Sequence, residues 1–166
     1  MEQPKKVVNV AAQDGPSLSV VGDTYRLVVT GKQTGGAYAV IDMLVPPGGG
    51  PGPHQHPGFH ETFHVLEGEV RVDFESESFT ARQGAFVGVP KGGGVHRFQN
   101  VSGSLARLWC VVIPAGLDDF FLEIGQPVAA GTFLPPPTMT PDEQQRLQTI
   151  AEKYGQQLAP PNYFDR

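Results

Sequence analysis

Short apolar runs, each broken by glycine or proline, recur along this chain and limit it to a fold of many short strands. The sequence holds 21 glycines and 16 prolines, and apolar and polar side chains alternate between them, as in EVRVDF at residues 69–74. Such alternation is typical of a strand with one buried face, and turn residues between several such strands predict an all-β fold. The expected strands cover residues 17–22, 24–31, 37–45, 54–56, 61–68, 69–76, 78–84, 85–90, 95–100 and 106–114.

The last third of the chain has a different pattern, which predicts two helices. Residues 117–125 read as a short helix that ends at Gly125, because glycine favours the backbone conformation that terminates a helix. A second helix begins after Thr140, which is a good N-cap residue, and Glu143 completes a capping box with it. This helix is expected to run to about Tyr154.

Length and charge exclude several classes of protein. A chain of 166 residues is long enough for one domain that buries roughly two thirds of the surface exposed by its unfolded form. The formal net charge is -5 and there is no basic run, so nucleic acid is not expected as a partner. No stretch approaches the roughly 20 apolar residues that cross a bilayer, and the N-terminus lacks a signal-peptide pattern. We therefore expect a cytoplasmic protein without membrane contact.

Three histidines and a glutamate form a candidate metal site. His54 and His56 stand at i and i+2 in an extended segment, and side chains two residues apart in a strand point the same way. Glu61 follows across a short turn, and His96 lies on a later strand. Three imidazoles and one carboxylate suit one divalent transition metal per chain, and Fe, Ni, Mn, Co, Cu and Zn all accept such ligands.

Glycines and prolines around these residues make the pattern more specific. The first group of positions is Gly48, His54, His56, Glu61 and Gly68, and the second is Gly84, Pro90, Gly92, His96 and Asn100. This spacing resembles the two signature motifs of the cupin superfamily. The first motif matches at every position. The second has one additional residue before its histidine, in Gly92-Gly93-Gly94-Val95, which we interpret as a slightly longer turn.

The resemblance implies a double-stranded β-helix, also called a jelly-roll barrel, with a metal bound inside it. On this basis the cupin barrel is expected at residues 23–115, after an N-terminal arm or strand at 1–22. Residues 116–166 are expected to form a short helical appendage that packs on the barrel or on a partner subunit.

Strand parity sorts the other residues near the candidate ligands. His60 and His64 have the parity opposite to Glu61, so we expect them to face away from the metal. Phe63 shares the parity of Glu61 and is expected on the interior wall. We expect four side chains to shape a substrate pocket, namely Tyr38, Met43, Phe63 and Phe98.

The candidate site is suited to reactions of a small-molecule substrate, with or without dioxygen. A metal with six coordination positions and four protein ligands keeps about two positions for substrate and for oxygen or water. Glu61 either serves only as a ligand or also takes a proton from a substrate hydroxyl as a general base. These properties leave the reaction itself open.

The tail of the chain adds a second resemblance. Residues 114–128 and the helix that ends in KYG are similar to those of cupins called quercetinase-like. In those that act on quercetin, the metal binds the deprotonated flavonol, and dioxygen cleaves its ring with loss of carbon monoxide. The resemblance implies that His54, His56, Glu61 and His96 are the ligands and that Glu61 is the base.

Three functions remain open from the sequence. The first is a metal-dependent dioxygenase that acts on an enolisable or phenolic, flavonol-like molecule. The second is a non-oxidative metal enzyme on the same barrel, such as an isomerase, a lyase or a decarboxylase. The third is a metal-binding or ligand-binding cupin without catalysis.

The strand at residues 106–114 bears on packing and on assembly. Cys110 is the single cysteine, which excludes an internal disulfide, and within LWCVVI it is expected to be a buried packing residue. Trp109 has the opposite parity and is expected to face outward. Because jelly-roll sheets have open edges and an apolar outer face, we expect a homodimer with Trp109 or the C-terminal helix near the interface.

Overall fold

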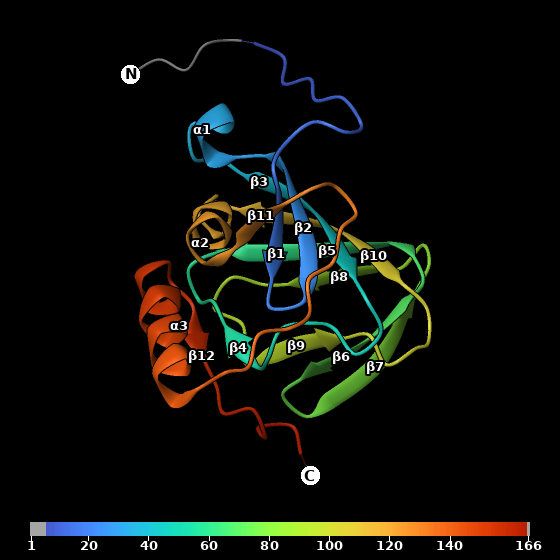
Figure 1. The fold of residues 1–166 in the computed structure, drawn as a ribbon, viewed down its shortest axis with the longest axis vertical. Coiled ribbons are helices and arrows are strands. Elements are labelled where there is room, and N and C mark those ends of the chain that lie inside the picture. Colours follow the sequence, from blue (N-terminus) through green and yellow to red (C-terminus); the bar gives the residue numbers. More distant parts are fainter. Residues whose placement is uncertain (1–5, 166) are drawn as a thin grey trace.

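The protein is a barrel of two antiparallel β-sheets in a computed structural model that describes residues 6–165 (Figure 1). The strands of the larger sheet, in spatial order, are β11 (Gln126–Val128), β1 (Ser17–Val20), β2 (Asp23–Val29), β3 (Ala39–Val45), β10 (Ala106–Ile113), β5 (His60–Glu67) and β8 (Phe86–Val89). The strands of the smaller sheet are β12 (Gln157–Leu158), β4 (His54–Gln55), β9 (His96–Gln99), β6 (Glu69–Phe74) and β7 (Glu77–Arg82). The predicted all-β jelly roll with a short C-terminal helical appendage is confirmed.

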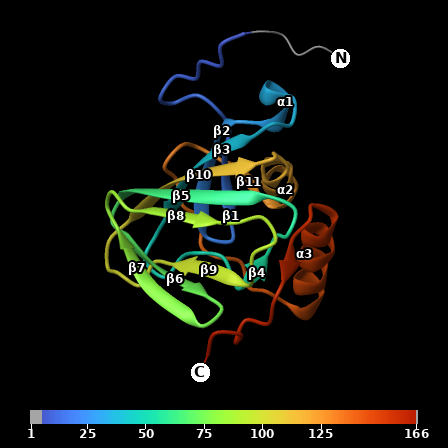
Figure 2. The same ribbon diagram turned by 180° about the vertical axis from the view of Figure 1, so that it is seen from behind.

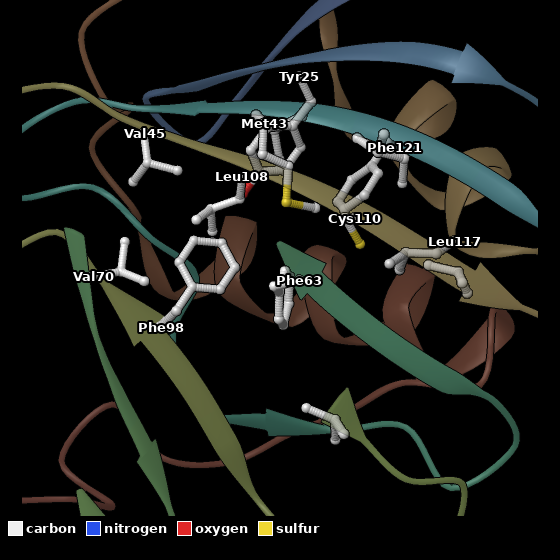
Figure 3. Close-up of a cluster of buried hydrophobic side chains, with 14 of the residues drawn as sticks. Tyr25, Met43, Val45, Phe63, Val70, Phe98, Leu108, Cys110, Leu117 and Phe121 are labelled. Carbon is white, nitrogen blue, oxygen red and sulfur yellow. The ribbon is translucent and has the colours of Figure 1, made fainter. Parts of the chain in front are cut away.

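Alternation along β10 determines which of its side chains enter the barrel. The inward residues, all fully buried, are Ala106, Leu108, Cys110 and Val112. Leu108 lies opposite Met43 on β3 and opposite Val65 on β5, so the central strand packs against both neighbours. Figure 3 shows Leu108 of this strand facing Phe98 of the smaller sheet. Each buried side chain of this size contributes about 2 kcal/mol through removal of apolar surface from water.

Both predicted helices are present and lie beside one end of the barrel. The helix α2 (Leu117–Ile124) ends at Gly125 and buries Leu117, Phe120 and Phe121. The helix α3 (Pro141–Lys153) starts with the predicted capping box. Its partly or fully buried side chains pack on the core, namely Leu147, Ile150 and Ala151. Figure 2 shows α3 next to β12 and β4. Across residues 6–165, no helix is both long and apolar enough to cross a membrane.

Three short elements have no counterpart in the sequence-based prediction. They are the helix α1 (Gly31–Thr34) and the strands β11 and β12. The strand β11 pairs with β1, and β12 pairs with β4, so the C-terminal third adds an edge strand to each sheet. Strands of two or three residues are too short to show an alternating pattern, and only their pairing partners define them.

The glycine-rich loop at residues 46–53 is held against the end of β9. Gly48 N donates to Asn100 O over 2.8 Å, and Asn100 N donates to Gly49 O over 2.9 Å. Gly50 has a φ of +121°, and a side chain there would clash with the carbonyl of Phe98. The close approach of this loop to β9 explains its glycines and sets the point at which β4 begins.

Candidate metal centre

The structure brings the four expected ligand residues together. His54 and His56 come from β4 and its end, Glu61 from the start of β5, and His96 from the start of β9. One ligand atom from each residue lies within 4.8 Å of those of the other three. All four side chains are buried, with exposed fractions between 2% and 6%. Residues far apart in the sequence thus lie around one point inside the barrel.

Strand pairing within each sheet, together with packing between the two sheets, produces this convergence. His54 lies directly opposite His96 in the antiparallel pair β4 and β9 of the smaller sheet. Glu61 belongs to the larger sheet, where it lies opposite Val112 on β10. The site therefore forms only when the inner faces of the two sheets pack together.

Backbone carbonyls orient two of the imidazoles. His54 Nδ1 lies 2.9 Å from Gly52 O, and His96 Nδ1 lies 3.0 Å from Gly94 O. A carbonyl only accepts hydrogen bonds, so each Nδ1 carries the proton and each Nε2 keeps its lone pair for a metal. Gly94 belongs to the turn that is one residue longer than the cupin motif, and its carbonyl aims His96 at the site.

Glu61 supplies the negative charge of the cluster. Its Oε1 lies 3.1 Å from His56 Nε2 and 3.6 Å from His96 Nε2. Burial alone would raise the pKa of Glu61, but the hydrogen bond from His56 and the nearby imidazole of His96 outweigh burial and hold that pKa well below its usual range. Burial lowers the pKa of His54 to about 4, so this imidazole is neutral at pH 7.

The ring nitrogens provide a direct test of whether a metal fits. His96 Nε2 is buried and has no hydrogen-bond partner among residues 6–165, although Glu61 Oε1 lies close to it. A buried lone pair without a partner is costly in a folded protein. A divalent cation among three imidazoles and one carboxylate would satisfy it and would balance the charge of Glu61. The donor set therefore fits a metal.

The thiol of Cys110 lies next to the second carboxylate oxygen of Glu61, Oε2. Its Sγ lies 3.8 Å from Glu61 Oε2, and burial raises the pKa of the thiol well above its ordinary value, so the neutral thiol donates to the carboxylate. Burial of Cys110 was predicted from the sequence and is confirmed. Its contact with Glu61 was not predicted, because Glu61 lies on the neighbouring strand and no local pattern links the two.

His60 and His64 lie outside this cluster. Both side chains are exposed on β5, whereas Glu61 and Phe63 are buried. His60 Nδ1 accepts a hydrogen bond from Lys91 N over 3.1 Å. The prediction from parity that these two histidines face away from the site is confirmed.

A cavity of about 740 Å³ adjoins the candidate ligands and extends toward the helices. His54 and Glu61 contribute to its wall, and Met43 and Phe98 line it as well. The helices α2 and α3 and residues 156–161 form the other side. The C-terminal third thus encloses the space next to the site.

Two of the four expected pocket residues do not line this cavity. Phe63 is buried in the core, where its ring packs on Phe98 with 5.1 Å between the ring centroids. Tyr38 packs on the outer face of the larger sheet beside Trp109 and Val40. The expectation that Tyr38 lines the pocket is corrected: Tyr38 has the same parity as Val40, so it lies on the outer face, opposite to Met43.

Asp23 and Tyr25 form a polar pair in the cavity wall that the sequence did not reveal. Tyr25 Oη donates to Asp23 Oδ2 over 2.8 Å, and Gly50 N donates to Asp23 Oδ1 over 3.2 Å. Asp23 is only 2% exposed, and burial raises its pKa to about 6 despite these hydrogen bonds. In the sequence, Asp23 only falls between the two strands that are expected at residues 17–22 and 24–31.

Asp23 is expected to make stability depend on pH. Because its folded pKa of about 6 lies above the ordinary 3.8, the folded state binds the proton more tightly than the unfolded state does. Stability is therefore lost as pH rises from about 4 to 6, by about 3 kcal/mol from this group. The Asp23→Asn variant has no carboxyl at this position and does not lose this stability. The difference in free energy of unfolding, variant minus wild type, should therefore increase by about 3 kcal/mol between pH 4 and pH 7.

Chemical denaturation at several pH values measures this difference. Asp119→Asn, which makes the same change at an exposed carboxyl on α2, is the matched control. An Asp23→Asn variant with a pH-independent difference would show that the carboxyl of Asp23 does not titrate in this range.

Comparison with known proteins agrees with the fold and the motifs. The family model described as "Cupin domain" matches residues 41–113. Over 120 residues the chain is 26% identical to quercetin 2,3-dioxygenase of Bacillus subtilis (strain 168), which covers 72% of this chain and 35% of that protein. The chain therefore spans about a third of the length of this relative.

Solved structures show the same fold at low sequence identity. A predicted oxalate decarboxylase from Thermotoga maritima superposes with a TM-score of 0.58 and 18% identity, over 64% of this chain and 99% of that one. Ectoine synthase from P. lautus superposes with a TM-score of 0.54 and 18% identity, over 76% of this chain and 87% of that one. The motif spacing and the two-sheet barrel agree with the match of residues 41–113 to the cupin domain, and the predicted resemblance to the cupin superfamily is confirmed.

Proposed function

We propose that this protein binds one divalent transition metal through His54, His56, Glu61 and His96, and that it acts as a dioxygenase on a small enolisable or phenolic, flavonol-like substrate. The observation that carries the proposal is the buried set of four ligand atoms within 4.8 Å of one another, at the wall of a large cavity. The similarity to a quercetin 2,3-dioxygenase supports the choice of reaction.

The residues of the site have separate tasks in this reaction. When bound, the metal supplies a Lewis acid for the oxygen donors of the substrate. Glu61 is anionic because of its contacts with His56 and His96, and it accepts the proton of a substrate hydroxyl. Cys110 donates to the second oxygen of Glu61 and keeps the carboxylate in place.

The cavity wall selects the kind of substrate. Met43, Phe98, Phe120 and Phe121 present apolar surfaces to it, and aromatic rings favour a flat aromatic partner. A cavity of about 740 Å³ lies within the usual range for sites that enclose a small organic molecule. A polyphenol or a cyclic diketone matches these walls.

A pair of carboxyls favours a second candidate, a non-oxidative metal enzyme. Glu61 has a pKa held low and Asp23 has a pKa raised to about 6, and both line the same cavity. Two carboxyls with pKa values moved in opposite directions are typical of acid–base chemistry such as isomerisation or elimination. Turnover under strict anaerobiosis would favour this function over the dioxygenase.

Elemental analysis of the purified protein, coupled to oxygen uptake over a panel of flavonols and diketones, tests the proposal. We expect about one transition metal per chain and consumption of dioxygen with at least one member of the panel. A metal content near zero after gentle purification would contradict metal binding. Bound metal without any change in the panel compounds would favour a binding protein without catalysis.

The proposal includes a homodimer. An apolar cluster on the outer face of the larger sheet consists of Val10, Val28, Val29, Tyr38, Val40, Trp109 and Val111. Trp109 is partly exposed there, and contact with a second copy would remove such surface from water. Light scattering at micromolar concentration should give twice the mass of the chain, and a monomer would contradict the prediction.

A further inference from the structure

Gln156 has a buried amide group without a partner. Its side chain is 5% exposed, and its Nε2 has no hydrogen-bond partner among residues 6–165. The residue lines the cavity that also contacts His54 and Glu61. An unsatisfied buried donor is costly, and native proteins contain few of them. The position of Gln156 in a cavity wall suggests a ligand as its missing partner.

The backbone on both sides of Gln156 is fixed. Gly155 follows the C-cap of α3 and has a φ of +80°. Gln156 N donates to Ala151 O over 2.9 Å. Beyond it, Leu158 pairs with His54 in the contact between β12 and β4. Side chains two residues apart in an extended segment share a face, which agrees with the presence of both Gln156 and Leu158 in the cavity wall.

The chemistry of this group defines its partner. A carboxamide N–H donates and has no lone pair for a metal, so the partner must be an oxygen or another acceptor. No acceptor among residues 6–165 forms a hydrogen bond with Gln156 Nε2. The acceptor is therefore left to a molecule in the cavity.

We propose that Gln156 donates a hydrogen bond to an oxygen of the small molecule in this cavity, other than the oxygens held at the metal, and so determines specificity. The inference rests on the proposed function, because it assumes that a small molecule occupies the cavity. It adds that the C-terminal segment recognises the substrate and that the substrate carries at least one further oxygen acceptor.

Thermal unfolding without substrate is the first test. Gln156→Met keeps the size of the side chain and removes the unpaired donor, so the metal-loaded variant should melt about 2–4 °C above wild type. Its metal content per chain should stay the same. Gln83→Met, which changes an exposed residue in a turn, should leave the melting temperature unchanged. A lower melting temperature or a loss of metal in Gln156→Met would overturn the proposal, because Gln156 would then support the fold or the metal site.

Anaerobic titration with two flavonols is the second test. Quercetin carries hydroxyl groups on its outer rings that 3-hydroxyflavone lacks, whereas both share the oxygens that chelate a metal. We expect Gln156→Met to bind quercetin about tenfold more weakly than wild type does, with little change for 3-hydroxyflavone. Equal losses for both compounds, or no loss for quercetin, would overturn the proposal.

The two tests separate the inference from the proposed function. If wild type binds neither flavonol, the flavonol-like substrate is wrong, and the melting temperature then decides on Gln156. A higher melting temperature of Gln156→Met would still support a hydrogen-bond donor that serves a ligand of another kind. A lower melting temperature would show that Gln156 stabilises the fold.

Discussion

Replacing His96 by alanine is expected to lower the affinity for a divalent transition metal more than about 100-fold. Removing a residue that only hydrogen-bonds to a metal ligand typically weakens metal binding 10–100-fold, and removing a ligand itself weakens it more. His96 Nε2 is buried, lacks a partner within residues 6–165 and lies 3.6 Å from Glu61 Oε1. His96 also follows the turn that is longer than the cupin motif, so this variant tests the least regular part of the site.

Metal content after dialysis and thermal unfolding with and without a chelator measure this loss. A ligand present at 100 times its dissociation constant stabilises the folded state by about 2.7 kcal/mol, so the chelator should lower the melting temperature of wild type but not that of His96→Ala. His64→Ala is the matched control, because this exposed histidine lies on β5 outside the cluster. Full metal content in His96→Ala would remove His96 from the ligand set.

Replacing Glu61 by glutamine is expected to lower turnover of the best substrate in the panel by a factor of about 10² to 10⁴, the usual contribution of a general base. Glutamine keeps the shape of the side chain, but it carries no charge and cannot accept the proton. Burial makes the change more severe, because the amide would face His56 and Cys110, which now contact an anion. Turnover is measured at saturating metal, so that weaker binding of the ion does not contribute.

A second substitution separates the two tasks of Glu61. Glu61→His retains a metal ligand and removes the carboxylate, so metal should remain bound while turnover falls as in Glu61→Gln. Glu67→Gln, at the exposed end of the same strand, should keep wild-type turnover. Full turnover in either Glu61 variant would show that Glu61 is not the base.

Much of the fold was predictable because alternation is a local property. The strand β10 buries every second residue over its whole length, and the capping box at Thr140 defines where α3 begins. The strands β11 and β12 were not predictable, because two or three residues are too few to show a period and their pairing with β1 and β4 is a long-range contact.

The residues that surround the candidate ligands were less predictable than the ligands themselves. Cys110 on β10 contacts Glu61 on β5, and Asp23 accepts a hydrogen bond from Gly50 N at the cavity wall. Gln156 reaches the same cavity from the end of α3. Each contact joins segments whose distance in space depends on how the sheets and helices pack, which no local pattern records. Tyr38 differs, because its parity relative to Met43 already indicates the outer face.

The sequence by itself determined the strands from β1 to β10, the capped C-terminal helix and the candidate ligand set, because periodicity and motif spacing act along the chain. Only the tertiary structure decided that His54, His56, Glu61 and His96 share one buried point, since these residues come from both sheets. It also decided that the glycine-rich loop, α2, α3 and β12 enclose the space beside that point. Packing between distant segments sets the environment of each ligand, and that environment controls its charge, orientation and access to a small molecule.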